Sequence, residues 1–219
     1  MLRPFLDGGA RRIVALDGSP ALVARAHDRI AADERLATAQ AEGRLELAVA
    51  DVRRVRRPDR FDLVVLAGVL AHLDGPEDAV QALGVVAGAL EADGRAIVDT
   101  LGPGGVPTND LPMSVDWERR IGDGRVVRRS SLTLNEVPEG LRVAYATLTD
   151  LVGADGTIAR VPASFRLWYP SPSAVAALAA EAGLEVEAAF GSHDLAPLDE
   201  GSERCIVVLR PASDGPGVG

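Results

Sequence analysis

The chain has 219 residues, of which 47% are hydrophobic and 25% charged, as in an ordinary globular protein of one domain or a domain with an added lobe. The net charge of −9 argues against nucleic acid as a partner, because neutralising phosphates requires clustered cations. One cysteine, Cys205, excludes an internal disulfide. No stretch approaches the ~18 apolar residues of a membrane span, and the N-terminus lacks a signal-peptide pattern. We therefore expect a cytoplasmic protein without a membrane partner.

The first elements are two apolar runs that each close on an aspartate. Residues 11–17 end at Asp17, and residues 45–51 end at Asp51. Between them, Ser19 and Pro20 supply an N-cap and a first-turn proline, which opens a helix. The pattern predicts two neighbouring parallel strands joined by a helical crossover.

The later elements continue this alternation and then depart from it. Residues 61–68 form a near-continuous apolar run, typical of a buried parallel strand. A helix from residue 76 to Gly94 and a strand over residues 95–100 should follow, and residues 102–124 are rich in glycine and proline, as in a loop or lid. Three alternating segments predict an antiparallel meander, and a helix and two strands close the chain before a tail that we expect to be disordered from Pro211. The segments of the meander are residues 126–134, 141–151 and 158–168.

The predicted fold is therefore α/β: a Rossmann-like, doubly wound, mostly parallel sheet with an antiparallel closing strand and an inserted antiparallel meander. We expect residues 1–101 to form the cofactor-binding core and residues 102–170 the lid. Residues 171–210 should return to the core, and residues 211–219 form the tail.

The two strand-ending carboxylates predict a nucleoside site. Open α/β sheets bind ligands in the crevice at the carboxyl ends of their parallel strands. Two carboxylates there suit an adenosine, one accepting the ribose hydroxyls and the other the adenine amino group, and Gly18 and Val52 would line the adenine slot. No glycine-rich loop precedes Asp17, although nucleotide-binding sheets usually place one about 20 residues before that acid.

These segments resemble the class I S-adenosylmethionine-dependent methyltransferases, in a small bacterial form with an inserted antiparallel lid. Residues 13–19 are similar to the second-strand segment of that family, residues 50–52 to the third, and residues 61–73 to the fourth strand and its turn beside the transferable methyl. The resemblance implies methyl transfer from S-adenosylmethionine to a small molecule, with Asp17 on the ribose hydroxyls, Asp51 on the adenine amino group and Gly68 near the cofactor.

The chain departs from the family at its start, where the first strand and the glycine-rich loop would precede residue 1. We therefore expect either a fragment or a misassigned start. This leaves open a non-catalytic, methyltransferase-like binding or interaction module. A nicotinamide-dependent enzyme is a further alternative because Asp17 alone would serve a dinucleotide, but Asp51 and the antiparallel closing strands count against it.

The remaining candidates concern the methyl acceptor. His72 is a weak candidate for a general base, against a structural role at a helix start. Trp117, Tyr145 and Tyr169 in the predicted lid, and His193 in a late loop, are candidates for an acceptor pocket, although the lid aromatics could equally form its own core. The three histidines lack ligand spacing, so we expect no metal site. The sequence leaves the acceptor and the oligomeric state open.

Overall fold

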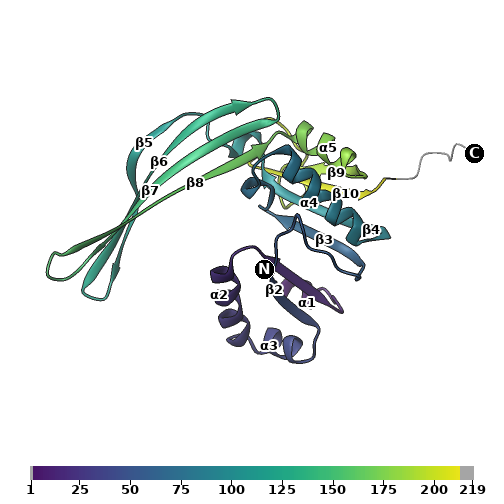
Figure 1. The fold of residues 1–219 in the computed structure, drawn as a ribbon, viewed down its shortest axis with the longest axis horizontal. Coiled ribbons are helices and arrows are strands. Elements are labelled where there is room, and N and C mark those ends of the chain that lie inside the picture. The colour runs from purple at the N-terminus through teal and green to yellow at the C-terminus, as the bar shows by residue number, and fades with distance from the viewer. Residues whose placement is uncertain (1, 213–219) are drawn as a thin grey trace, which may run out of the picture. The chain divides into compact units, whose positions relative to one another are not determined.

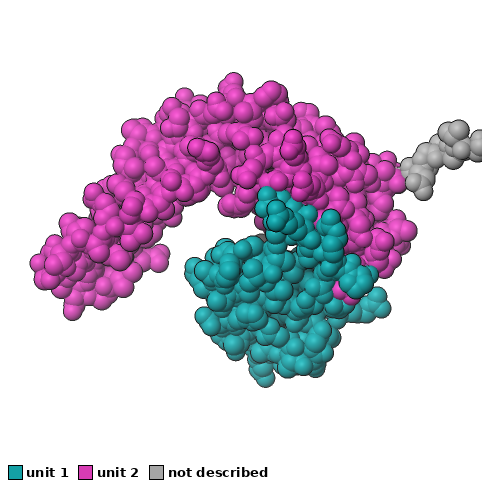
Figure 2. All heavy atoms as spheres, viewed as in Figure 1, with its two compact units in different colours: residues 1–58 teal, residues 59–219 magenta. Residues whose placement is uncertain are grey.

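A computed structural model describes residues 2–212 of the chain. It divides into two compact units, residues 1–58 and residues 59–219, which Figure 2 colours separately. Each unit is described by itself below, with the element labels of Figure 1.

The first unit is a two-stranded parallel sheet packed against helices. Its elements in chain order are α1 (Leu2–Asp7), β1 (Ile13–Asp17), α2 (Pro20–Ala31), α3 (Glu34–Ala41) and β2 (Leu45–Val49). The Ser19 hydroxyl accepts the Leu22 amide at 3.3 Å and caps α2, as the sequence predicts. The helix α3 was not predicted; Asp33 caps it, accepting two of its backbone amides. Ile30, Ala39 and Leu45 form the buried core between the helices and β2.

The second unit contains a mixed four-stranded sheet in the order β3-β4-β10-β9. Its strands are β3 (Phe61–Ala67), β4 (Leu90–Leu101), β9 (Leu184–Phe190) and β10 (Arg204–Pro211). β3 and β4 run parallel, and β10 is antiparallel to both β4 and β9. Because β10 reverses the direction twice, β9 runs parallel to β3 and β4. The carboxyl ends of these three strands therefore share one edge of the sheet.

Two helices pack against this sheet and against each other. α4 (Pro76–Ala89) contacts β3 and β4, and α5 (Pro172–Glu181) contacts β9. α4 ends at Ala89, five residues before Gly94, so the expectation that Gly94 terminates this helix is wrong. Gly94 lies instead within β4, where a Cβ atom would stand 2.8 Å from the Phe61 carbonyl oxygen of β3. The glycine signal in the sequence marks a close approach of two strands.

A second four-stranded sheet, antiparallel throughout, extends from this unit as long curved ribbons (Figure 1). Its strands are β5 (Leu111–Ile121), β6 (Gly124–Val137), β7 (Gly140–Val152) and β8 (Ile158–Pro170). β6, β7 and β8 confirm the predicted meander. β5 falls within residues 102–124, where we expect a loop; its side chains are exposed along its whole length, so the sequence offers no burial pattern to reveal it.

Short segments complete the second unit. The 3-10 turns η1 (Leu70–His72) and η2 (Pro103–Gly105) follow β3 and β4. Ala71 of η1 packs with Val143 and Tyr169, which joins the curved sheet to the turn after β3. Pro211, where the predicted tail begins, still belongs to β10, and residues 213–219 of that tail lie outside the described residues. The predicted domain boundaries stay predictions.

Candidate functional site

In the first unit, Asp17 and Asp51 lie at the same end of adjacent parallel strands. β1 and β2 pair in parallel with Asp17 opposite Val49, and the Ala50 amide donates to the Asp17 carbonyl oxygen at 3.0 Å. Asp51 follows one residue later. The local sequence thus positions both carboxylates at the carboxyl edge of this strand pair, where open α/β sheets bind ligands.

One of the two oxygens of the Asp17 carboxylate accepts a hydrogen bond within the described residues. Its Oδ1 accepts the Ser19 amide at 2.7 Å, which fixes the side chain against the start of α2. Its Oδ2 accepts no hydrogen bond from any described residue, and the side chain is exposed. An ionised carboxylate is an acceptor only, so this oxygen suits a ligand hydroxyl.

Both oxygens of the Asp51 carboxylate accept hydrogen bonds from Arg53. Arg53 donates Nε to Oδ1 at 2.9 Å and Nη2 to Oδ2 at 2.7 Å, and its backbone amide also donates to Oδ1. These contacts, the guanidinium first, lower the pKa of Asp51 to about 2. Asp51 is therefore a fixed negative charge with less acceptor capacity left for a ligand than Asp17.

The other two residues predicted for the adenine slot flank these acids. A Cβ atom on Gly18 would meet only the Ala50 carbonyl oxygen, at 3.9 Å, so the space beside Gly18 is open. Val52 is half-buried in the turn that follows Asp51. Both positions are compatible with the predicted slot.

In the second unit, Gly68 ends β3 in a left-handed conformation with φ of +69°. Its amide donates to the Asp99 carbonyl oxygen of β4 at 2.7 Å, and a Cβ atom would meet nothing within 4 Å. Turn geometry therefore accounts for this glycine, and the space beside it is open. His72 lies exposed at the end of η1.

Sequence reasoning missed a charged cluster at the same edge of this sheet. The Asp99 carboxylate accepts Arg204 Nε on Oδ1 at 3.0 Å and lies 3.1 Å from His193 Nε2 through Oδ2. Asp99 sits near the end of an apolar strand, like Asp17 and Asp51, and that signal could have identified it. His193, predicted as an acceptor-side residue, is thus brought next to a carboxylate that the sequence did not single out.

The lid aromatics do not form one pocket. Tyr145 stacks on Phe165 with ring centroids 4.9 Å apart, and Tyr169 is buried with only 7% of its surface exposed. Burial, and then the hydrogen bond with Tyr145, raise the pKa of Tyr169. Trp117 lies on exposed β5 and pairs with Arg128, away from the two tyrosines along the sheet. Packing of the lid thus explains Tyr145 and Tyr169 without a ligand.

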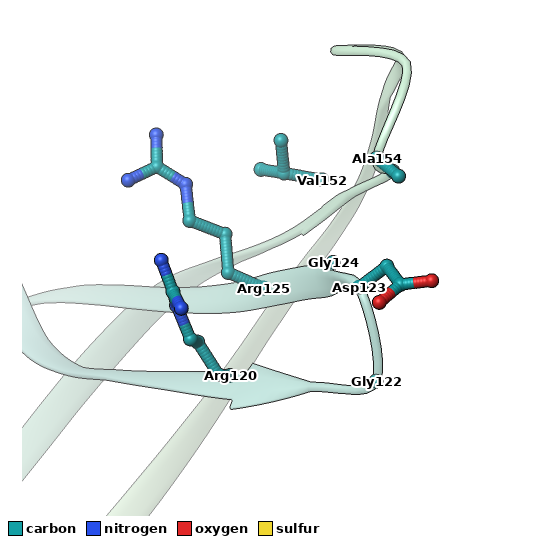
Figure 3. Close-up of a pocket in the computed structure, with 8 residues that line it drawn as sticks. Arg120, Gly122, Asp123, Gly124, Arg125, Val152 and Ala154 are labelled. Atoms are coloured by element: carbon teal, nitrogen blue, oxygen red, sulfur yellow. The ribbon is translucent and has the colours of Figure 1, made fainter.

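The described residues also form a shallow cavity of about 310 Å³ at the hairpin tips of the curved sheet. Arg120 and Arg125 rise from adjacent strands on the same side of this cavity, whereas Asp123 points away from them (Figure 3). The opposite ends of β7 and β8 meet the turn after β3, so this cavity lies far from Gly68 and Asp99. It contains none of the predicted site residues.

Two features are absent from the described residues, 2–212. No cluster of three or more His, Cys, Asp or Glu residues could hold a metal ion. No helix is long and apolar enough to cross a membrane.

Comparison with known proteins identifies the kind of domain. Residues 1–96 match a family model described as a methyltransferase domain. The first part of the chain is therefore similar to a methyltransferase domain. A search of curated proteins gave no match.

Solved structures extend the similarity to most of the chain. The CcbJ methyltransferase from Streptomyces caelestis is 18% identical, with a TM-score of 0.74 over 96% of this chain and 78% of that one. The sugar N-methyltransferase KedS8 from Streptoalloteichus sp is 20% identical, with a TM-score of 0.64 over 91% and 71%. CalS10 from Micromonospora echinaspora, an amino pentose methyltransferase solved with S-adenosylmethionine bound, is 18% identical, with a TM-score of 0.65 over 96% and 78%. The chain thus shares the α/β fold of these proteins over most of its length.

Proposed function

We propose that this protein transfers a methyl group from S-adenosylmethionine to an amine of a small-molecule acceptor. The open Oδ2 of Asp17, at the carboxyl end of β1 and next to a strand of the same direction, is the observation that carries the proposal. The methyltransferase family match over residues 1–96 covers this strand pair and supports it.

The residues of the first unit fit the adenosine part of the cofactor. Asp17 would accept the ribose hydroxyls on its open oxygen, and Gly18 leaves room for the nucleoside. Asp51 would contact the adenine amino group only by sharing its carboxylate with Arg53. Val52 would line the base. The parallel β1–β2 and β3–β4 pairs, with β10 antiparallel, support the expected Rossmann-like, doubly wound arrangement.

When bound, S-adenosylmethionine supplies an electrophilic methyl group on a positively charged sulfur. The residues of this chain then have to align the acceptor with that methyl and exclude water. Orientation alone can contribute about 7–11 kcal/mol to a displacement of this kind. Gly68 would lie near the cofactor, and residues 102–170, which include the curved sheet, would form the lid.

The class of acceptor comes from the names of the structural relatives. KedS8 is described as a sugar N-methyltransferase and CalS10 as an amino pentose methyltransferase. Both share the fold with this chain, over 91% and 96% of its length. We therefore infer an amine on a small, sugar-like molecule, and no nucleic acid or membrane as partner.

One observation favours a second candidate, a methyltransferase-like module that binds without catalysis. Both oxygens of Asp51 are already occupied by Arg53, and the ion pair lowers the pKa of this acid to about 2. If Arg53 does not release Asp51, the adenine contact is lost and cofactor affinity falls.

Isothermal titration with S-adenosylhomocysteine separates the two candidates. We expect binding by the wild type and a loss of about 10- to 100-fold in affinity for Asp17→Asn, because a hydrogen bond to a charged group contributes about 1.5–3 kcal/mol. Asn keeps the Ser19 contact but turns the open acceptor into a donor. Asp28→Asn, an exposed acid on α2, is the matched control and should bind like the wild type. No binding by the wild type supports the module, and equal binding by Asp17→Asn excludes the assigned role of Asp17.

A further inference from the structure

The loop of residues 191–203 connects β9 to β10 at the carboxyl edge of the four-stranded sheet. β9 is parallel to β3 and β4, so its end lies at the edge where Gly68 and Asp99 also lie. Backbone hydrogen bonds tie the far side of this loop to η2: Gly102 donates to the Glu203 carbonyl at 2.9 Å, and Gly104 donates to that of Ser202 at 2.9 Å. The loop is thus anchored where acceptor-side residues are expected.

His193 projects from this loop with one nitrogen held and the other open. Its Nε2 lies 3.1 Å from Asp99 Oδ2, and 70% of its side chain is exposed. No contact of Nδ1 with a described residue is present. The side chain of Asp99 is 16% exposed and half enclosed by the sheet.

Arg204 occupies one of the two oxygens of the Asp99 carboxylate. Its Nε and Nη2 both donate to Asp99 Oδ1, and the other oxygen, Oδ2, faces His193. An ionised carboxylate can only accept, so a neutral His193 must place its hydrogen on Nε2. The open Nδ1 then carries the lone pair.

Few other charges face this imidazole. Asp99 comes from β4 and Arg204 from β10, and Asp194 follows His193 in the loop. The buried Cys205 thiol lies next to Arg204 in β10; its pKa is raised by burial and then by Asp99. The carboxylate in direct contact with His193 is that of Asp99.

We propose that His193 is the general base of the reaction and Asp99 the residue that positions it. This proposal rests on the proposed function and narrows its substrate class to an amine that binds as an ammonium ion. The ammonium nitrogen gives one proton to His193 Nδ1 and becomes a neutral amine. Its lone pair forms the nitrogen–carbon bond as the carbon–sulfur bond breaks, and the positive charge passes from sulfur to nitrogen. The imidazolium returns its proton to water.

The geometry also links this pair to the turn after β3. The Gly68 amide donates to the backbone carbonyl of Asp99, the same residue whose carboxylate holds His193. Asp99 therefore holds the turn at Gly68 through its backbone carbonyl and His193 through its carboxylate. A structural role for Asp99 alone, through Arg204, would not require an exposed histidine on its second oxygen.

The first test is methyl transfer from labelled S-adenosylmethionine to a panel of 2-, 3- and 4-amino-deoxyhexoses. We expect His193→Gln to lower kcat by about 100-fold or more at pH 7, the lower end of general-base catalysis. Gln retains a donor toward Asp99 but cannot take a proton. The loss should shrink at a pH at which the free aminosugar is already neutral. Asp194→Asn is the matched control and should leave kcat unchanged.

The second test needs no acceptor. Nitrogen NMR of labelled histidine should show neutral His193 with its hydrogen on Nε2. In Asp99→Asn, the amide oxygen stays with Arg204 and the amide nitrogen faces His193, so the hydrogen should move to Nδ1. The protein has three histidines, so the signal missing from His193→Gln identifies the residue.

Each outcome decides the proposal. An unchanged kcat in His193→Gln, an unchanged tautomer in Asp99→Asn, or a wild type that methylates none of the aminosugars overturns it. S-adenosylhomocysteine titration in parallel distinguishes the two levels: binding without aminosugar methylation overturns this inference alone, whereas no binding removes the proposed function beneath it.

Discussion

Acids close to the ends of three strands behave differently because their immediate neighbours differ. Asp17 uses one oxygen to accept the Ser19 amide, Asp51 uses both for Arg53, and Asp99 divides its two between Arg204 and His193. The sequence pattern is similar in each case. What a strand-end carboxylate can bind is therefore decided by the one or two donors that the fold brings to it.

Gly94 shows the same dependence on a single neighbour. A Cβ atom there would meet the Phe61 carbonyl at 2.8 Å and Glu91 backbone atoms at 3.1 Å, none of which can turn aside. We expect Gly94→Ala to lower the free energy of unfolding by about 1–3 kcal/mol, the usual cost of overpacking.

Gly84 is the matched control for that substitution. It lies inside α4 with nothing within 4 Å of a Cβ atom, so Gly84→Ala should stabilise by about 0.4–1 kcal/mol. Urea unfolding of both variants measures the contrast. Two variants of equal stability would show that β4 can move away from β3 at no cost.

At the scale of elements, the curved sheet is held by a buried ion-pair network as well as by its ladders. Asp150 of β7 is 4% exposed and accepts from Arg129 of β6 and Arg160 of β8. One carboxylate thus ties three neighbouring strands together. The Arg160 and Arg129 hydrogen bonds lower the pKa of Asp150 to about 2.

This network predicts a pH-dependent stability. Since the folded pKa of Asp150, about 2, lies below the ordinary 3.8, its contribution is complete above pH 3.8 and is lost as the pH falls through about 2. Asp150→Asn should therefore melt several degrees below the wild type at pH 7. The gap should close as the pH approaches 2. Thermal melts followed by circular dichroism test this; Asp123→Asn, in the β5–β6 turn, should show no gap, and a gap that persists at low pH would contradict the mechanism.

At the scale of the whole molecule, the net charge of −9 and the exposed apolar side chains of β5 have opposite effects on solubility. The charge keeps copies apart at neutral pH. Leu111, Val115 and Ile121, each at least half exposed, favour association once that charge is removed.

We expect solubility to be lowest near the isoelectric point of about 4.9 and high at pH 7. Light scattering across this pH range measures it. Trp117→Thr, which removes an exposed aromatic from β5 without changing the charge, should reduce the scattering at the minimum. A minimum near neutral pH would show that apolar contacts outweigh charge.

The sequence alone determined the elements whose burial is periodic and the acids that end them. Apolar runs gave β1, β2 and β3, the Ser19 cap gave α2, and alternation gave β6 to β8, because these signals are local in the chain. β5 was not predicted because a fully exposed strand has no burial pattern. The end of α4 was misplaced because Gly94 is required by its close approach to Phe61 on another strand, not by the end of the helix.

Only the tertiary structure decided how the acids are used. Residue 99 is distant in the chain from residues 193 and 204, and their meeting follows from two antiparallel pairings, which place β10 beside β4 and β9 beside β10. Likewise, the occupation of Asp51 by Arg53 depends on a turn conformation that residue types do not specify. The sequence placed carboxylates at strand ends; the packing between strands set which oxygens remain open to a ligand.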